Sequence, residues 1–226
     1  MIDRLKLRLR SLPEVYGADP VTFRARAAAW LHFQLSDHAF LRGLWANFAE
    51  VAPGVFRANQ PSPRRLRDWH ARGFRSVLNL RGASTHAFHV FERREAAALG
   101  LTLADLKMSA KVLPSRETLL DLHTLFTTLP RPMVMHCKSG ADRTGLAAAL
   151  YLLLIENRSI PEAQQQLSFR FLHRKDSASG VLDHLLSTYA RDHAASGIAP
   201  LDWIRTAYDP VTITADWATG RAGRRR

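Results

Sequence analysis

The segment MHCKSGADRTGL, residues Met135 to Leu146, places a nucleophile beside a potential anion-binding loop. Cys137 is the single cysteine of the chain, and Arg143 follows it by six positions. A short loop of glycine and small residues can turn successive backbone N–H groups inward, which makes a nest for an anion. The N-terminus of the helix expected after the loop and the forked guanidinium of Arg143 add to the same positive field. The ligand we expect in this loop is a phosphate group.

Cys137 would lie at the bottom of that nest, and its surroundings predict an ionised sulfur. A helix N-terminus and a nearby arginine lower the pKa of a thiol below its free value of about 8.5. A thiolate behind a bound phosphorus is placed for in-line attack, which gives a cysteinyl phosphate that water then hydrolyses. Thr144 can donate a hydrogen bond to the sulfur as it leaves. The predicted chemistry is therefore the hydrolysis of phosphate esters.

The elements that must position this loop alternate between strands and helices. Short apolar runs predict strands at 55–58, 75–80, 101–106 and 132–136. Capping residues and helical spacing predict helices at 62–72, 87–99, 115–129, 143 onward, 159–172, 182–195 and 201–207. This alternation predicts an α/β fold with a central, mainly parallel sheet flanked by helices. Such sheets bind ligands at the carboxyl ends of their strands, which is where Cys137 falls.

Three segments are expected along the chain. Residues 1–50 form an N-terminal helical extension, because their apolar residues recur at the spacing of two short amphipathic helices. Residues 51–208 form the α/β domain, which begins where the proline-rich stretch VAPGVFRANQPSP changes the pattern. Residues 209–226 form a basic C-terminal tail, which ends in a solvated, disordered arginine cluster.

Composition narrows the class of protein and its partners. The chain is 46% hydrophobic and 23% charged, as in soluble globular proteins. One cysteine excludes an intramolecular disulfide framework and fits the reducing cytoplasm. The first ten residues lack the apolar stretch of a signal peptide, and the run Leu146 to Ile155 is half of a membrane span. A net charge of +12 favours polyanionic partners.

The stretch from His136 to Gly145 resembles the H-C-x5-R-[ST]-G signature of the cysteine-dependent protein tyrosine and dual-specificity phosphatases. VFRANQPSP and SVLNLRG are similar to segments of the small bacterial dual-specificity-like phosphatases, so the resemblance covers about 51–172. It implies that Cys137 attacks and that His136 orients the loop and helps to keep the thiolate. It implies no cofactor. The phosphate-binding loop would consist of Lys138, Ser139, Gly140, Ala141, Asp142 and Arg143.

The sequence offers two candidates for the general acid, Asp142 and Asp105. Hydrolysis of a phosphomonoester needs a proton for the leaving oxygen, and a positioned acid contributes about 10²–10⁴ in rate. The family usually supplies an aspartate from a loop, but residues 109–115, where that loop should lie, hold no carboxylate. We rank Asp142 first, because it resembles the loop aspartate of myotubularin-like phosphatases, and Asp105 second; a structural role is the alternative for each. Arg81 is a supporting candidate at the end of a neighbouring strand.

Several substrate classes fit the same chemistry. Protein phosphotyrosine, with phosphoserine or phosphothreonine beside it, is the leading expectation. A lipid or inositol phosphate is the alternative, favoured by Lys138, by Asp142 and by the basic and leucine-rich residues 4–10, which suit peripheral contact with an anionic membrane. RNA is disfavoured, because no basic and aromatic strand pattern is present. A non-catalytic phosphate-binding module and a rhodanese-like sulfurtransferase remain as further alternatives, and the scattered histidines suggest no metal site.

Overall fold

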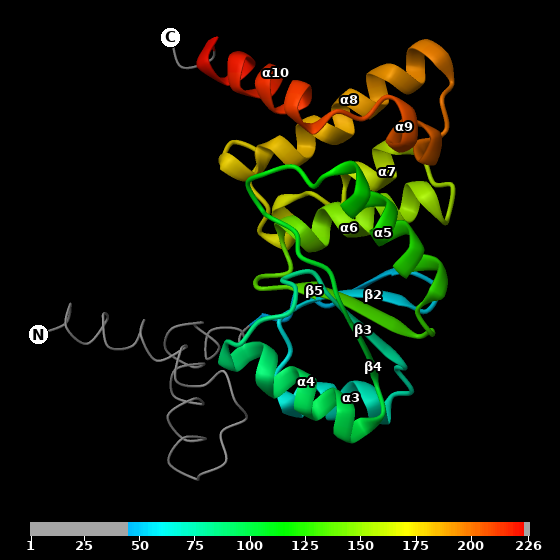
Figure 1. The fold of residues 1–226 in the computed structure, drawn as a ribbon, viewed down its shortest axis with the longest axis vertical. Coiled ribbons are helices and arrows are strands. Elements are labelled where there is room, and N and C mark those ends of the chain that lie inside the picture. Colours follow the sequence, from blue (N-terminus) through cyan, green and yellow to red (C-terminus); the bar gives the residue numbers. More distant parts are fainter. Residues whose placement is uncertain (1–44, 224–226) are drawn as a thin grey trace, which may run out of the picture.

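A computed structural model describes residues 45–223 of the chain, and its centre is a five-stranded sheet (Figure 1). The strand order is β1-β2-β5-β3-β4. The four strands from β2 to β4 in this order run parallel, and β1 is antiparallel to β2 at one edge. The expected mainly parallel sheet is confirmed. The strands are β1 (Ala49–Ala52), β2 (Val55–Asn59), β3 (Ser76–Asn79), β4 (Thr102–Asp105) and β5 (Met133–Cys137).

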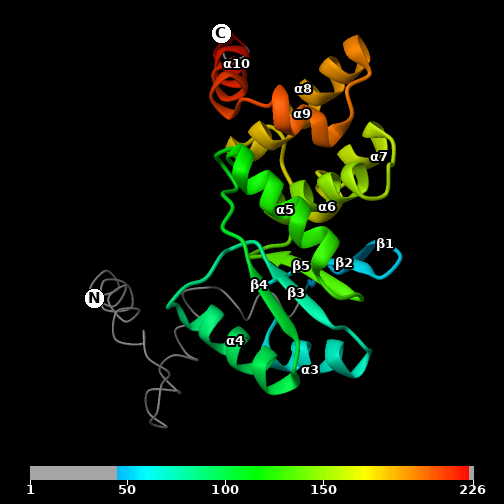
Figure 2. The same cartoon turned by 45° about the vertical axis from the view of Figure 1, so that its right-hand side comes forward.

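Helices cover both faces of this sheet (Figures 1 and 2). One face carries α3 (Pro63–Ala71) and α4 (Ala87–Leu99), and the other carries α5 (Arg116–Thr128) and α6 (Asp142–Leu154). A further helical layer lies beyond α6 (Figure 2). Its members are α7 (Ile160–Gln164), η2 (Phe169–Phe171), η3 (Ala178–Gly180), α8 (Val181–Ser196), α9 (Pro200–Thr206) and α10 (Pro210–Gly223).

Each face of the sheet has its own apolar core. The smaller core, under α3 and α4, includes Leu66, Trp69 and Val77. The larger core surrounds α6, which is buried without interruption from Thr144 to Leu153. A helix that is apolar all round must be enclosed on all sides, and α6 lies between the sheet and the outer helical layer. This enclosure fixes the N-terminus of α6, and with it the loop that precedes the helix.

Local capping signals place several of the helices where the sequence predicts them. The hydroxyls of Ser62 and Ser115 accept backbone N–H groups at the starts of α3 and α5. A capping box joins Ser159 to Glu162 at the start of α7. Gly100 ends α4 in the left-handed region at φ +67°. A side-chain cap of this kind stabilises a helix by about 1 kcal/mol.

The helix expected over 159–172 is wrong in its length, because α7 ends at Gln164. The carbonyl of Gln166 accepts a hydrogen bond from Arg57 of β2 at 2.8 Å, and Leu172 adopts φ +63°. A tertiary donor thus takes a carbonyl that a continuing helix would use, and the chain turns back toward the sheet. The segment 165–173 consequently lies beside the loop that follows β5 (Figure 1).

Both ends of the described chain differ from expectation. The apolar spacing predicts that the second helix of the extension continues to residue 48. This last part of the prediction is wrong, because residues 45–48 form no helix and β1 begins at Ala49. Residues 210–223, expected as part of a basic tail, form helix α10, because Ile213 is buried and Trp217 packs on the larger core. Residues 1–44 and 224–226, which include most of the expected extension and the last arginines, lie outside the described chain. None of the helices within residues 45–223 is both long and apolar enough to cross a bilayer.

Candidate active site

The parallel strands bring the candidate residues to one edge of the sheet. Cys137 ends β5 and is paired in register with Asn59, the last residue of β2. On the other side of β5, His136 is paired in register with Asn79 of β3. Asn79 is paired in register with Asp105 of β4. The loop 138–141 and the N-terminus of α6 follow Cys137 directly. The segment singled out from the sequence therefore lies at the carboxyl edge of the central strand, where α/β sheets bind ligands.

The Cys137 side chain is 1% exposed and lies in a field that favours the thiolate. Burial by itself would raise the pKa of the thiol. The charge of Arg143 opposes this, together with the nearby Thr144 hydroxyl and the backbone N–H groups of Thr144 and Gly140. The net effect is a thiol pKa below its ordinary value. A buried thiolate held by donors is a preorganised nucleophile.

Donors behind the loop hold its backbone carbonyls. Asn47 Nδ2 donates to the carbonyl of Ser139 at 2.7 Å, and Arg57 Nη2 donates to the carbonyl of Gly140 at 2.7 Å. A C=O and the N–H of the next residue point in opposite directions across a planar trans peptide. Fixing the Ser139 carbonyl outward therefore turns the Gly140 N–H inward, in agreement with its hydrogen bond to the Cys137 sulfur.

Arg57 holds the loop from behind and was not singled out from the sequence. Its side chain is fully buried, and its guanidinium also donates to the backbone and side-chain oxygens of Gln166 at 2.8 and 2.7 Å. The Phe171 ring lies 3.6 Å from its Cζ. Burial lowers the pKa of Arg57 to about 9, against the attraction of Cys137, so the group remains a cation at neutral pH. The available signal was a basic residue inside a buried apolar strand, which needs a partner.

The buried ring of His136 is in close contact with Glu92 of α4. Its Nε2 lies 2.6 Å from Glu92 Oε1, and both side chains are 0% exposed. Gln60 Nε2 donates to the other oxygen of Glu92 at 2.9 Å. Arg81, the supporting candidate on the chain after β3, donates to Gln60 Oε1 at 2.8 Å. His136 and Arg81 are thus linked through Glu92 and Gln60, neither of which was singled out from the sequence.

Arg143 is the second residue of α6, and its Nε is buried with no hydrogen-bond partner among the described residues. An unpaired buried donor costs about 1–3 kcal/mol, more when it is charged. An anion in the loop would satisfy this donor and would meet the guanidinium in the two-pronged geometry that arginine gives to phosphate. The unpaired Nε at this position therefore fits a phosphate site, although the buried Nε atoms of Arg57 and Arg116 are unpaired as well within the described part of the chain.

The two acid candidates are held differently. Asp105 accepts hydrogen bonds from Asn79 at 2.7 Å and from His89 at 2.8 Å. Partial burial would raise the pKa of Asp105, but these hydrogen bonds outweigh it and hold the pKa below its usual range. Asp105 is also on β4, two strands from β5, which at about 4.8 Å per strand places its backbone about 10 Å from the central strand. The structure brings it to the same edge but not beside Cys137.

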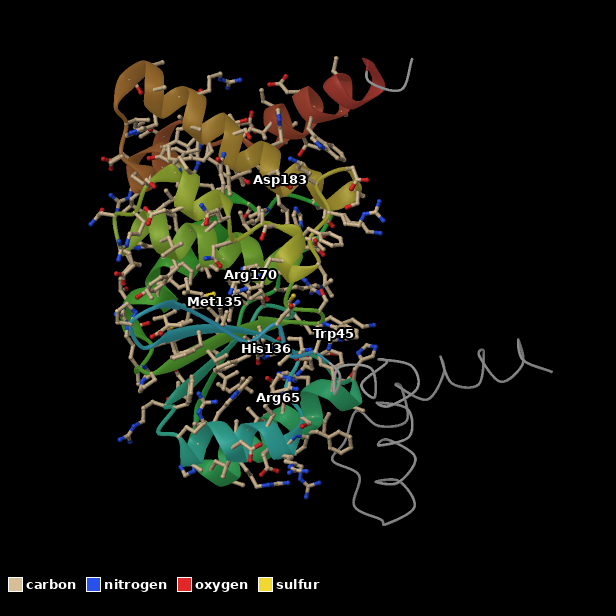
Figure 3. The ribbon with its side chains drawn as sticks, turned by 180° about the vertical axis from the view of Figure 1, so that it is seen from behind. Trp45, Arg65, Met135, His136, Arg170 and Asp183 are labelled. Atoms are coloured by element: carbon tan, nitrogen blue, oxygen red, sulfur yellow. The ribbon has the colours of Figure 1, made fainter. Side chains whose placement is uncertain are left out.

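Asp142 lies at the start of α6, directly before Arg143, and its Oδ1 is 2.7 Å from Nδ1 of His173. The second ring nitrogen of His173 is 2.7 Å from Oδ2 of Asp183 on α8. Figure 3 shows Asp183 and Arg170 in the helical layer above the sheet and His136 at the sheet itself. His173 was not singled out from the sequence, because nothing in its local pattern signals a contact across 31 residues.

Comparison with known proteins agrees with this geometry. The model of the tyrosine phosphatase family matches residues 56–159. No curated protein matches the chain. Among solved structures, P. aeruginosa TpbA is 21% identical over 72% of this chain and 90% of its own, with a TM-score of 0.52, and a TpbA variant in complex with phosphotyrosine matches equally well. The Siw14 catalytic core is 19% identical over 69% of this chain and 94% of its own, with a TM-score of 0.51.

These likenesses show the fold, and the family match covers the strands and the loop that build the site. They confirm the resemblance that the signature from His136 to Gly145 indicates. Residues 56–159, with Cys137 and Arg143 at the carboxyl edge of the sheet, match the model of the tyrosine phosphatase family.

Proposed function

We propose that this protein hydrolyses phosphomonoesters through a cysteinyl-phosphate intermediate. The observation that carries the proposal is the pairing of a buried Cys137, whose pKa is lowered, with an Arg143 whose buried Nε has no partner among the described residues. The first is the state that a nucleophile needs, and the second is the donor that a phosphate needs. A structural cysteine in an apolar core would instead have its pKa raised by burial.

The steps follow from the positions of these groups. The loop 138–143 and the guanidinium of Arg143 bind the three non-bridging oxygens of the ester. The Cys137 sulfur forms a bond to phosphorus while the bond to the leaving oxygen breaks, and Asp142 supplies the proton that makes the leaving group an alcohol. Water then attacks phosphorus, the sulfur–phosphorus bond breaks, and Thr144 stabilises the returning thiolate with its hydroxyl.

Phosphotyrosine in proteins is the proposed main substrate, with phosphoserine and phosphothreonine as slower ones. The Cys137 side chain is 1% exposed, so the reacting phosphorus must reach below the protein surface. An aryl ester holds its phosphate farther from the peptide backbone than a serine or threonine ester does. A thiolate nucleophile also needs a reducing compartment, and we propose the cytoplasm.

A lipid or inositol phosphate is the second candidate. Phe169 is 75% exposed and Leu172 is 49% exposed, on a segment whose Phe171 carbonyl accepts from the same Asn47 amide that holds the loop. Arg170 lies between them and is close enough to Arg57 to affect its pKa. Exposed apolar side chains with an arginine, placed beside a phosphate site, suit the surface of an anionic membrane.

Phosphate release by the purified wild-type protein and by Cys137→Ser tests the proposal. The panel consists of p-nitrophenyl phosphate, phosphotyrosine and phosphoserine peptides, phosphoinositides, phosphatidylglycerophosphate and triphosphate-ended RNA. We expect release that needs Cys137, needs no added metal and is fastest with the phosphotyrosine peptide. Preference for the lipids would favour the second candidate. Binding of vanadate without release from any substrate would refute catalysis and leave a phosphate-binding module.

A further inference from the structure

His173 connects the phosphate loop to the outer helical layer through two carboxylates. Its Nδ1 is 2.7 Å from Asp142 Oδ1 on α6, and its Nε2 is 2.7 Å from Asp183 Oδ2 on α8. A carboxylate oxygen accepts and does not donate, so both contacts need a proton on the ring nitrogen. A neutral imidazole carries one such proton, whereas the imidazolium carries two. With both carboxyl groups ionised, the two contacts therefore require His173 to be a cation between two anions.

Exposure and position distinguish the roles that His173 and the two aspartates can have. The His173 side chain is 1% exposed, so it has no direct access to a bound ester. The Asp142 side chain is 24% exposed and stands next to Arg143 at the mouth of the loop. Asp183 is similarly exposed at 27% but lies on α8, whereas Asp142 is next to the loop, so a proton held by His173 reaches a substrate in the loop through Asp142.

We propose that His173, clamped between Asp142 and Asp183, stores the proton that Asp142 delivers to the leaving oxygen and recovers it in the second half of the reaction. This inference rests on the phosphatase function proposed above. His173 is then a positioning and proton-storing residue, because it acts through Asp142 and does not touch the ester.

The proton balance closes within one turnover. In the first step the N–H bond at Nδ1 of His173 breaks, Asp142 passes the proton on, and an O–H bond forms on the departing alcohol. His173 is left neutral, with its remaining proton on Nε2 toward Asp183. In the second step an O–H bond of the attacking water breaks as its oxygen bonds to phosphorus, and that proton returns through Asp142 to Nδ1 of His173.

The charges around His173 support this arrangement. Burial would lower the pKa of its imidazolium, but the hydrogen bonds and charges of Asp142 and Asp183 outweigh burial and raise the pKa to about 9. These two carboxylates are the charged groups that act on it from the helices packed against it. In its own segment, Arg174 is paired with Asp176 at 2.9 Å. The stored proton is consequently present at neutral pH, where an isolated aspartic acid of pKa about 3.9 has lost its own.

The test compares pH–rate profiles of His173→Gln and Asp183→Asn with those of two matched surface controls, His70→Gln on α3 and Asp121→Asn on α5. Phenyl phosphate needs an acid for its leaving group, whereas p-nitrophenyl phosphate needs one much less. We expect the alkaline limb for phenyl phosphate to lie near pH 9 in the wild type and to move by several units toward the carboxyl range in His173→Gln. At pH 7 that variant should lose about 10²–10⁴ in kcat with phenyl phosphate and far less with p-nitrophenyl phosphate.

A second measurement does not depend on turnover or on the fold of a His173 variant. In Cys137→Ser, NMR titration of the His173 ring should give a pKa near 9, and adding Asp183→Asn should lower that value. Three results would each refute the proposal that His173 stores the proton. They are an alkaline limb that does not move in His173→Gln, an equal loss of kcat with both substrates, and a His173 ring that titrates near its ordinary value of about 6.5. Wild-type turnover of p-nitrophenyl phosphate that needs Cys137 would still support the phosphatase function in those cases, and its absence would refute that function separately.

Discussion

Replacement of Gly140 by alanine tests whether the loop geometry depends on a close approach of two backbones. Gly140 has φ +75°, and a Cβ there would lie 2.7 Å from the carbonyl oxygen of Ala58 and 2.9 Å from Cβ of Asn47. The left-handed conformation costs a non-glycine residue about 1–2 kcal/mol. To restore an ordinary contact of 3.4 Å, the loop must move by about 0.7 Å away from β2.

A displacement of that size acts on the reaction as well as on stability. A misplacement of about 1 Å costs up to about 10²-fold in rate, so we expect kcat/KM for p-nitrophenyl phosphate to fall by about that factor in Gly140→Ala. Strain from the overpacked loop should add about 1–3 kcal/mol to the loss of stability. Urea unfolding measures the free energy of unfolding, and steady-state kinetics at pH 7 measures the rate.

Gly100→Ala is the matched control for this change. Gly100 has a similar φ of +67°, but a Cβ there meets nothing within 4 Å. The control should lose about 1–2 kcal/mol of stability through the backbone strain alone and keep its kcat/KM. If Gly140→Ala is no less stable than the control and retains its activity, the close approach to β2 does not shape the loop and the reasoning is refuted.

Three further perturbations probe the charges of the site. Because the pKa of Cys137 is lowered mainly by Arg143 against the effect of burial, the pH midpoint of alkylation by iodoacetamide should lie below 8.5 in the wild type and rise in Arg143→Ala; equal midpoints would contradict this origin. Arg57→Met should keep the side-chain volume but release the Gly140 carbonyl. We expect kcat/KM to fall by about 10-fold or more and urea unfolding to show a loss of about 3 kcal/mol in stability. Arg64→Met on the surface of α3 should change neither quantity. Because the pKa of His173 is raised in the folded state, its contribution to stability is complete below about pH 6.5 and is lost as the pH rises through about 9; urea unfolding should show this loss in the wild type and not in His173→Gln.

Sequence reasoning was most successful where the determinants are close along the chain. Ser62, Ser115 and the pair Ser159 and Glu162 act within three residues of the helix starts that they cap, and α3, α5 and α7 begin there as expected. Sequence reasoning failed where a contact with a residue far along the chain determines the length of a helix. The helix after Ser159 was expected to continue to 172, but Arg57, 109 residues from Gln166, takes the carbonyl at its end.

The sequence by itself determined which residues form the loop and which chemistry to expect of them. The nucleophile, the arginine and the glycine that permits the turn all lie between Cys137 and Arg143, so residue type and spacing were enough to predict a phosphate site between a strand and a helix. The parallel sheet was likewise indicated by the alternation of strands and helices, and the structure confirms it.

Only the tertiary structure decided which groups hold that loop and what surrounds its aspartates. Arg57 and Asn47 reach the loop from 83 and 92 residues away, and no periodicity or spacing encodes such contacts. The same holds for Asp142, whose partner His173 is brought to it by the turn after α7. Hydrogen bonding and burial set the protonation of a carboxylate or an imidazole, and both are properties of the folded neighbourhood instead of the chain order.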